Sequence, residues 1–318
     1  MLLTIFLVIV SLVILIFGGD LLVKGASSLA KRWGIPALVI GLTVVAFGTS
    51  MPELVVNVFS ALKGATGIAV GNIVGSNISN IFLILGISAI IFPLTVKDST
   101  AWKEIPFAIL AGIVLLFMGN DILFDGFNSN ILSRTDGLVL LSVFAIFLYY
   151  VVNLAKTNKT APEKIEVLSW TRSFLYLFSG TALLFFGGQL LVDNAVILAR
   201  IAGMSEMLIG LTIIAIGTSM PELITSAVAA YHNHADIAVG NIIGSNIFNI
   251  FWVLGLTSVI KPLPFGGGIN FDITVQIIAT LLLFLCLLIG TKKKIDRWQG
   301  IVFVLLYISY ITYLIFRG

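Results

Sequence analysis

Long apolar runs dominate the chain, and only short polar stretches separate them. Each run has about 20 residues, which is the length that a helix needs to cross the hydrocarbon core of a bilayer. The polar stretches leave no room for a soluble domain. The pattern therefore predicts an all-α integral membrane protein with ten transmembrane helices. These are expected at residues 3–30, 37–61, 67–93, 104–119, 137–155, 172–199, 206–230, 236–260, 272–290 and 299–316.

Two segments of the chain recur almost unchanged further along it. Residues 41–53 read GLTVVAFGTSMPE, and residues 210–222 read GLTIIAIGTSMPE. Residues 69–80 read AVGNIVGSNISN, and residues 238–249 read AVGNIIGSNIFN, so that both pairs are offset by 169 residues. The match predicts two halves of five helices each. Because five is odd, the second half enters the membrane from the opposite side, which makes the halves an inverted repeat.

The repeat extends to the first helix of each half, where FGGDLLV at residues 17–23 matches FGGQLLV at residues 186–192. We assign residues 1–155 to the first five-helix repeat and residues 172–318 to the second, inverted one. The longest polar stretch, residues 156–171, is the expected cytoplasmic linker between them.

Composition and charge support a membrane location and give an orientation. A mean hydropathy of +1.12 with only 10% charged residues does not fit a soluble chain. With the N-terminus outside, twelve lysines and arginines fall on the inner side and five on the outer side, leaving out Lys24 within the first helix. The positive-inside rule therefore predicts both termini outside. Basic residues at the membrane borders orient the chain among lipids, and we expect no nucleic-acid partner.

The first repeated segment predicts a broken helix beside a carboxylate. Pro52 has no N–H, so the carbonyl four residues before it loses its helical partner, and the helix should kink or unwind over residues 46–52. Glu53 lies four and three residues beyond Thr49 and Ser50, so these three side chains can share a face. The second half repeats the arrangement with Pro221, Glu222, Thr218 and Ser219.

The second repeated segment predicts a polar stripe on an apolar helix. Asn72, Ser76 and Asn80 lie four residues apart and so share one face. The matching stripe consists of Asn241, Ser245 and Asn249. Folding the halves together about their two-fold axis brings glutamates, hydroxyls and amides to one site at the midplane. Because these ligands are all oxygens, and Ca²⁺ takes about six to eight of them, the residues predict a hard-cation site for Ca²⁺ with Na⁺ competing.

GTSMPE paired with GNIVGSN or GNIIGSN, in an inverted ten-helix chain, resembles the sodium/calcium exchangers of the calcium/cation antiporter superfamily, of the short prokaryotic type. The resemblance implies that Glu53 and Glu222 are the central ion ligands. Many members carry an aspartate at the position of Asn249, where this chain has an amide, so only two carboxylates are expected and the stoichiometry is left open. The other implied ligands are the side chains of Thr49, Ser50, Thr218, Ser219, Ser76, Ser245 and Asn80 and the carbonyls of Ala46 and Ala215.

The resemblance further implies a secondary antiporter that exchanges Na⁺ for Ca²⁺ by alternating access in the plasma (inner) membrane of a prokaryote. An empty site holding two negative charges is costly in a low dielectric, so only loaded states should switch sides. We expect a monomeric functional unit and no cofactor besides the transported ions. The alternative is a proton-coupled or other cation/Ca²⁺ exchanger, while a passive channel fits inverted broken helices poorly.

Other polar residues point to no further chemistry. No nucleophile–base pair or histidine metal cluster is visible, so we do not expect an enzyme. Asp20 and Lys24 lie four residues apart on the first helix and should form a local ion pair. His232 and His234 lie in a loop, where we expect them to be solvated.

Overall fold

The computed structural model of the chain describes residues 1–64, 66–98, 100–124, 126, 128–157, 167–203, 215–266, 268–289 and 293–317. In the first half the elements, with η for π-helical segments, are α1 (Leu2–Trp33), α2 (Ala37–Ile40), η1 (Gly41–Val45), α3 (Ala46–Thr49), α4 (Met51–Leu62), α5 (Thr66–Ser79), η2 (Asn80–Leu85), α6 (Gly86–Ile91), β1 (Leu94–Thr95), η3 (Thr100–Glu104), α7 (Ile105–Met118), α8 (Asp121–Phe124), β2 (Ile131–Leu132) and α9 (Arg134–Thr157). In the second half they are α10 (Trp170–Ile201), α12 (Ala215–Thr218), α13 (Met220–Tyr231), α14 (Ala235–Ile247), η5 (Phe248–Leu254), α15 (Gly255–Ile260), β3 (Leu263–Pro264), α16 (Ile269–Ile289), β4 (Lys294–Ile295) and α17 (Arg297–Arg317).

The described helices confirm an all-helical membrane protein. Eight helices in the described ranges are long and apolar enough to cross a membrane, and there are nine if the pair Ala37–Thr49 and Met51–Leu62, bent by 43° at its break, counts as one span. The one remaining expected helix, at residues 206–230, begins outside the described residues. The count of ten therefore stays a prediction.

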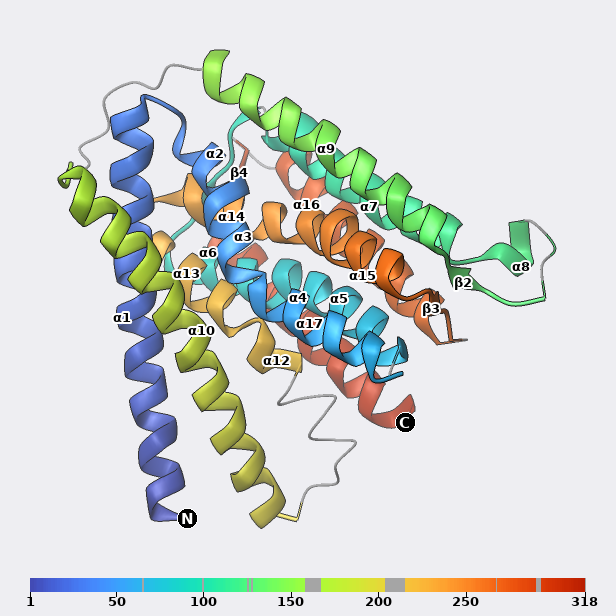
Figure 1. Cartoon of the computed structure of the whole chain (residues 1–318). Helices are drawn as coiled ribbons and strands as arrows, with labels where there is room; N and C mark the ends of the chain where they lie inside the picture. The colour runs from blue at the N-terminus through green and yellow to red at the C-terminus, as the bar shows by residue number, and fades with distance from the viewer. Residues whose placement is uncertain are drawn as a thin grey trace.

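The first helices of the two halves run in opposite directions. In Figure 1, α1 rises from the N-terminus at the lower edge, whereas α10 descends beside it. Glycines let the two backbones touch where they cross: a β-carbon added to Gly180 would lie 2.6 Å from the backbone nitrogen of Leu22 and 2.8 Å from the carbonyl oxygen of Gly18. This antiparallel pair is what an inverted repeat requires of equivalent helices.

The last helices of the two halves are exchanged. β1 pairs with β4 through Leu94 and Ile295, and β2 pairs with β3 through Leu132 and Leu263, so each short strand joins one half to the other. Beyond these strands, α9 packs on α15 and α17 packs on α6. Each half therefore completes the helical core of its mate, and the two halves are interlocked.

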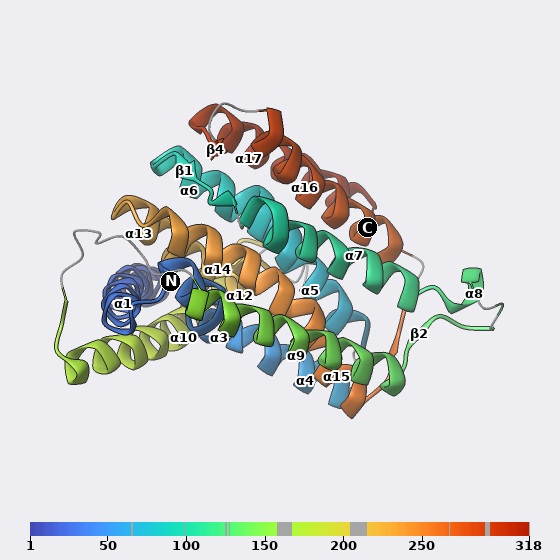
Figure 2. The same ribbon diagram turned by 90° about the horizontal axis from the view of Figure 1, so that it is seen from above.

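Two spans form the centre of the bundle. Figure 2 shows α5 and α14 in the middle, with α1 and α10 together at one edge. In the most apolar window, 94% of Ala235–Ile260 and 78% of Ala69–Ile91 are buried, against 22% of Leu2–Trp33. A helix that is enclosed on all sides has no lipid-facing surface, so polar side chains on these two spans can only face protein or a site within it.

Candidate cation site

The helix break expected at the proline motif is present in both halves. Ser50 and Ser219 leave the helical conformation, with φ and ψ of −85° and 6° and of −88° and 6°. The next helices, α4 and α13, begin one residue later and carry Glu53 and Glu222 in their first turns. The break is narrower than the predicted 46–52, because Pro52 lies in the first turn of a new helix, where its missing N–H costs nothing. Each carboxylate thus lies at a helix N-terminus, whose dipole favours negative charge.

The two glutamates are buried, with 1% of each exposed, and have different surroundings. Glu222 Oε1 accepts hydrogen bonds from Ser50 Oγ in the other half at 3.2 Å and from Ser245 Oγ at 3.5 Å. The hydroxyls at the equivalent positions, Ser219 and Ser76, bond to each other at 3.3 Å instead of to Glu53. Glu53 and Glu222 are near enough for their charges to repel each other. The structure thus brings the predicted carboxylates and serines of both halves together.

Threonine and asparagine side chains connect the broken helices to the central ones. Thr49 Oγ1 donates to Asn241 Oδ1 at 3.1 Å, and Asn241 Nδ2 donates to Ser226 Oγ at 3.0 Å. The equivalent residues are Thr218, Asn72 and Asn57, which are joined by bonds of 3.4 and 3.0 Å. Asn57 and Ser226 are not among the residues predicted from the sequence, although their offset of 169 residues marks them as repeat mates.

Asn80 and Asn249 lie in the π-helical segments η2 and η5, an irregularity that is frequent at functional sites. Asn80 Nδ2 donates to Asn246 Oδ1 at 2.8 Å, and Asn249 Nδ2 donates to Asn77 Oδ1 at 3.0 Å. Four oxygens of the predicted ligands are buried and lack a hydrogen-bond donor within the described chain: Glu53 Oε2, Glu222 Oε2, Asn80 Oδ1 and Asn249 Oδ1. Unpaired buried acceptors are costly, and a cation would satisfy them.

The remaining predicted ligands are backbone carbonyls. The carbonyl of Ala46 accepts the Ser50 N–H at 3.0 Å and lies 3.4 Å from Thr49 Oγ1, whose hydrogen goes to Asn241. Ala215 begins α12, and its predicted role rests on the resemblance. No cluster of three or more His, Cys, Asp or Glu side chains occurs among the described residues, so a cation here would depend on hydroxyls and amides besides the two carboxylates.

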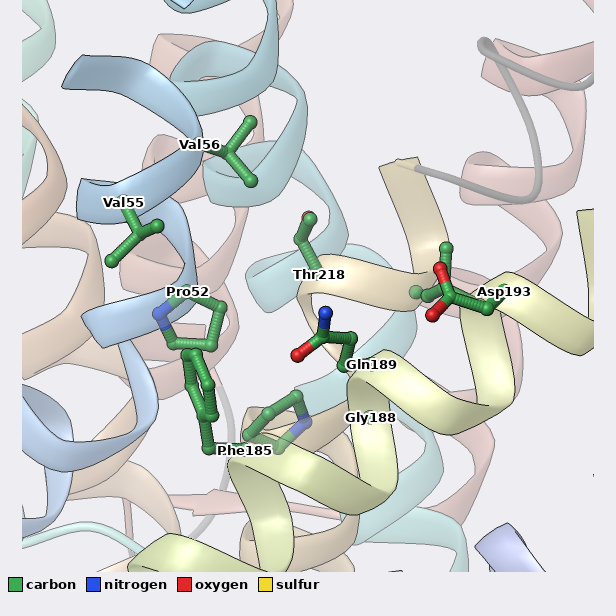
Figure 3. Close-up of a pocket in the computed structure, with 11 residues that line it drawn as sticks. Pro52, Val55, Val56, Phe185, Gly188, Gln189, Asp193 and Thr218 are labelled. Atoms are coloured by element: carbon green, nitrogen blue, oxygen red, sulfur yellow. The ribbon is translucent and has the colours of Figure 1, made fainter. Parts of the chain in front are cut away.

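A cavity of about 240 Å³ lies beside the broken helices on one side of the molecule. Figure 3 shows Pro52 and Val55 on α4, Thr218 on α12 and Gln189 on α10 around it. Gly188 also lines the cavity, and a β-carbon added there would meet nothing closer than Pro221 at 3.8 Å.

The equivalent place in the other half is closed. A β-carbon added to Gly19, the repeat mate of Gly188, would lie 2.9 Å from Ile224 Cγ2 on α13. The halves therefore differ in conformation although their sequences match.

A hydrogen bond between Asp20 and His232 holds the closed side. The predicted pair of Asp20 and Lys24 is confirmed, with 2.6 Å between Oδ2 and Nζ. The other carboxylate oxygen of Asp20 lies 2.8 Å from His232 Nε2. His232 lies in a turn and is partly exposed, as expected, but its side chain also links α1 to the end of α13.

Two inverted repeats whose broken helices meet at a buried oxygen-lined site define the class of secondary cation transporters. The family model described as sodium/calcium exchanger protein matches residues 3–153 and 172–316, and the chain belongs to that family. The chain is 41% identical over 272 residues to the inner membrane protein YrbG of Escherichia coli K12, covering 82% of this chain and 81% of YrbG. It is 29% identical over 351 residues to the sodium/calcium exchanger MaX1 of Methanosarcina acetivorans, covering 98% of both.

A solved structure has the same fold. The sodium-calcium exchanger NCX_Mj, soaked with Na⁺ and Ca²⁺, superposes with a TM-score of 0.83 at 36% identity, and the match covers 98% of each chain. The similarity thus extends over both repeats and the site between them.

Proposed function

We propose that this protein is an antiporter that exchanges Na⁺ for Ca²⁺ by alternating access at the Glu53–Glu222 site. The observation that carries the proposal is the set of four buried oxygens that lack donors within the described ranges, two of them from carboxylates whose charges would repel each other. A bound cation supplies the positive charge that these atoms lack. One Ca²⁺ or two Na⁺ neutralise two carboxylates, so both substrates suit the same site.

The proposed ligand set draws equally on the two halves. The glutamates supply the charge, and the hydroxyls and amides complete an oxygen shell of the kind that Ca²⁺ prefers. The set consists of Glu53, Thr49, Ser50, Ser76, Asn80 and the Ala46 carbonyl, with Glu222, Thr218, Ser219, Ser245, Asn249 and the Ala215 carbonyl.

Coupling follows from the cost of moving an empty site. A charged side chain at the centre of a membrane costs about 2.5–3.5 kcal/mol even on the lower of the available scales. A site with two uncompensated carboxylates therefore resists rearrangement until a cation arrives. Transport in one direction then depends on a counter-ion for the return, which couples the two fluxes.

The cavity beside Gly188 is the proposed access route in the present conformation. With both termini outside, as the positive-inside rule predicts, Gln189 lies in the outer half of α10 and the cavity faces outward. Both termini lie toward the lower edge of Figure 1, in keeping with an even number of spans. The likeness to YrbG, named an inner membrane protein, supports the prokaryotic inner membrane as the location.

Purified protein in liposomes tests the exchange directly. Ca²⁺ uptake should require an opposing Na⁺ gradient and persist when the pH gradient is collapsed. Uptake that follows the pH gradient without Na⁺ would instead establish the proton-coupled alternative, and uptake that needs no counter-ion would indicate a channel.

Carboxylate-to-amide variants test the site. Glu53→Gln or Glu222→Gln should abolish exchange, because each removes one of the two charges that bind the cation, while the protein remains folded. Asp98→Asn is a matched control, since Asp98 is an exposed carboxylate that pairs with Lys293 away from the site. Full activity in either glutamate variant would contradict the assignment.

A further inference from the structure

Four asparagines form a closed set at the junction of the halves. Asn77 and Asn246 are repeat mates, 169 residues apart, and each donates its side-chain N–H to the backbone carbonyl of the other, at 3.2 and 3.3 Å. Their Oδ1 atoms accept from Asn249 and Asn80, at 3.0 and 2.8 Å. None of the four side chains is more than 2% exposed. The set therefore obeys the symmetry of the repeat and excludes water.

The backbone carbonyls determine which way all four amides face. A carbonyl oxygen can only accept, so Asn77 must direct its Nδ2 toward Asn246 O and its Oδ1 toward Asn249. Asn249 must then present Nδ2 to Asn77, which leaves Asn249 Oδ1 on the opposite side, without a donor in the described chain. The same reasoning applied from Asn246 leaves Asn80 Oδ1 free. Turning any one of the four side-chain amides by 180° would break at least one of these hydrogen bonds.

The free amide oxygens lie on the faces that carry the site. Asn249 is four residues beyond Ser245, which donates to Glu222, and Asn80 is four residues beyond Ser76, which contacts Ser219. Residues four apart share a helix face. Each free Oδ1 thus belongs to the same polar face as the glutamate site.

We propose that Asn77 and Asn246 are positioning residues that fix Asn249 and Asn80 as neutral oxygen ligands of the cation, and that Asn77 thereby sets the charge of the site by requiring an amide at position 249. This inference rests on the proposed exchange function. A carboxylate at position 249 would direct an acceptor oxygen at Asn77 Oδ1. Asn77 cannot turn its Nδ2 toward that carboxylate without directing its own Oδ1 at the carbonyl of Asn246.

Asn249→Asp tests the proposal through its dependence on Asn77. An ionised carboxylate presents an acceptor to Asn77 Oδ1, whereas the amide presents a donor. At one fixed pH we expect Na⁺-driven Ca²⁺ uptake to be slower than in the wild type by about tenfold, as expected when a buried hydrogen bond becomes a contact between two acceptors.

Second variants distinguish Asn77 from general effects of the new charge. Asn77→Ser removes the opposing Oδ1 and leaves room for a hydroxyl or water to donate, so Asn77→Ser/Asn249→Asp should recover most of the lost uptake. The wrong-partner control, Asn246→Ser/Asn249→Asp, should stay slow. By symmetry, Asn80→Asp should be slowed in the same way, and Asn246→Ser should restore its uptake.

The outcomes separate the two proposals. If the wild type exchanges Na⁺ for Ca²⁺ but Asn249→Asp transports at the wild-type rate, or is equally slow with and without Asn77→Ser, the positioning role is wrong while the exchange function holds. If the wild type shows no Na⁺-dependent Ca²⁺ transport, the exchange function itself is wrong.

Discussion

Alternating access makes opposite predictions for the two mates Gly19 and Gly188. In this conformation Gly19 packs tightly against Ile224, whereas Gly188 borders the cavity lined by Val55. If the halves exchange conformations during transport, Gly188 should close against Val55 in the opposite state and Gly19 should move away from Ile224. Gly19→Ala should then disfavour the present conformation, and Gly188→Ala should disfavour the opposite one.

The magnitude follows from the contacts. A β-carbon on Gly19 would lie 2.9 Å from Ile224 Cγ2, about 0.6 Å inside the usual carbon–carbon separation of about 3.5 Å. Ile224 is β-branched and its γ-methyl cannot easily rotate away. Overpacking of this kind costs about 1–3 kcal/mol, which corresponds to roughly a 5- to 150-fold change in the ratio of the two states. At Gly188 the nearest atom is 3.8 Å away, an ordinary contact, so an added methyl costs little in the present state.

Thiol labelling measures the populations. A cysteine introduced by Val55→Cys lines the cavity, and the native Cys286 is removed by Cys286→Ala so that only position 55 reacts. A membrane-impermeant thiol reagent applied from the cavity side should label position 55 more slowly after Gly19→Ala and at least as fast after Gly188→Ala. The double variant penalises both states and should bring the labelling rate back toward that of the Val55→Cys/Cys286→Ala parent.

The cancellation in the double variant is the decisive part. If both single variants change labelling in the same direction, or if their effects in the double variant add instead of cancelling, the two glycines do not report on opposite states. Thermal melting of each variant provides the control, because a general loss of stability would lower the melting temperature without opposite shifts in labelling.

Two further substitutions test contacts outside the site. Asp20→Ala should remove the bond to His232 that closes one side. Labelling of a cysteine at position 55 should then slow by about 2- to 10-fold, as expected for one hydrogen bond. Lys24→Gln alters only the exposed partner of Asp20 and should change the labelling rate little. Gly300→Ala should reduce the free energy of unfolding by the cost of overpacking, about 1–3 kcal/mol, and so lower the melting temperature, because the new β-carbon would lie 2.6 Å from the carbonyl oxygen of Gly86. An unchanged melting temperature would show that α17 does not pack on α6 as described.

Features that depend on local sequence were predictable. Proline at the start of α4 and of α13 interrupts the helix wherever the chain is placed, so the breaks at Ser50 and Ser219 follow from chemistry within one turn. The four-residue spacing that aligns Ser76 with Asn80 is likewise a property of a single helix. The order of residues along each helix is therefore enough to predict which carboxylates, hydroxyls and amides share a face.

Features that depend on two halves meeting were not predictable. Asn77 follows Ser76 directly and points about 100° away from the polar stripe, so on its own helix it resembles an isolated polar residue. Its partner is Asn246, its own mate, and only the crossing of the central helices brings the two together. The paired strands that exchange the last helices are two residues long, too short for any periodic signal.

The two halves differ in conformation although their motifs match. Residues away from the cation site stabilise the closure of one side. On the closed side Asp20 bonds to His232; the mates of these residues are Gln189 and Lys63, an amide and a cation. An amide binds a lysine more weakly than a carboxylate does, so the opposite state lacks an equivalent closing contact. Gln189→Glu should supply it and shift the population away from the present state, slowing the labelling of position 55 by roughly 2- to 5-fold, as for a partly exposed ion pair. Lys63→Gln in the same chain should cancel the shift. Faster labelling after Gln189→Glu, or a shift that survives Lys63→Gln, would show that the pair formed by these mates does not close the second side.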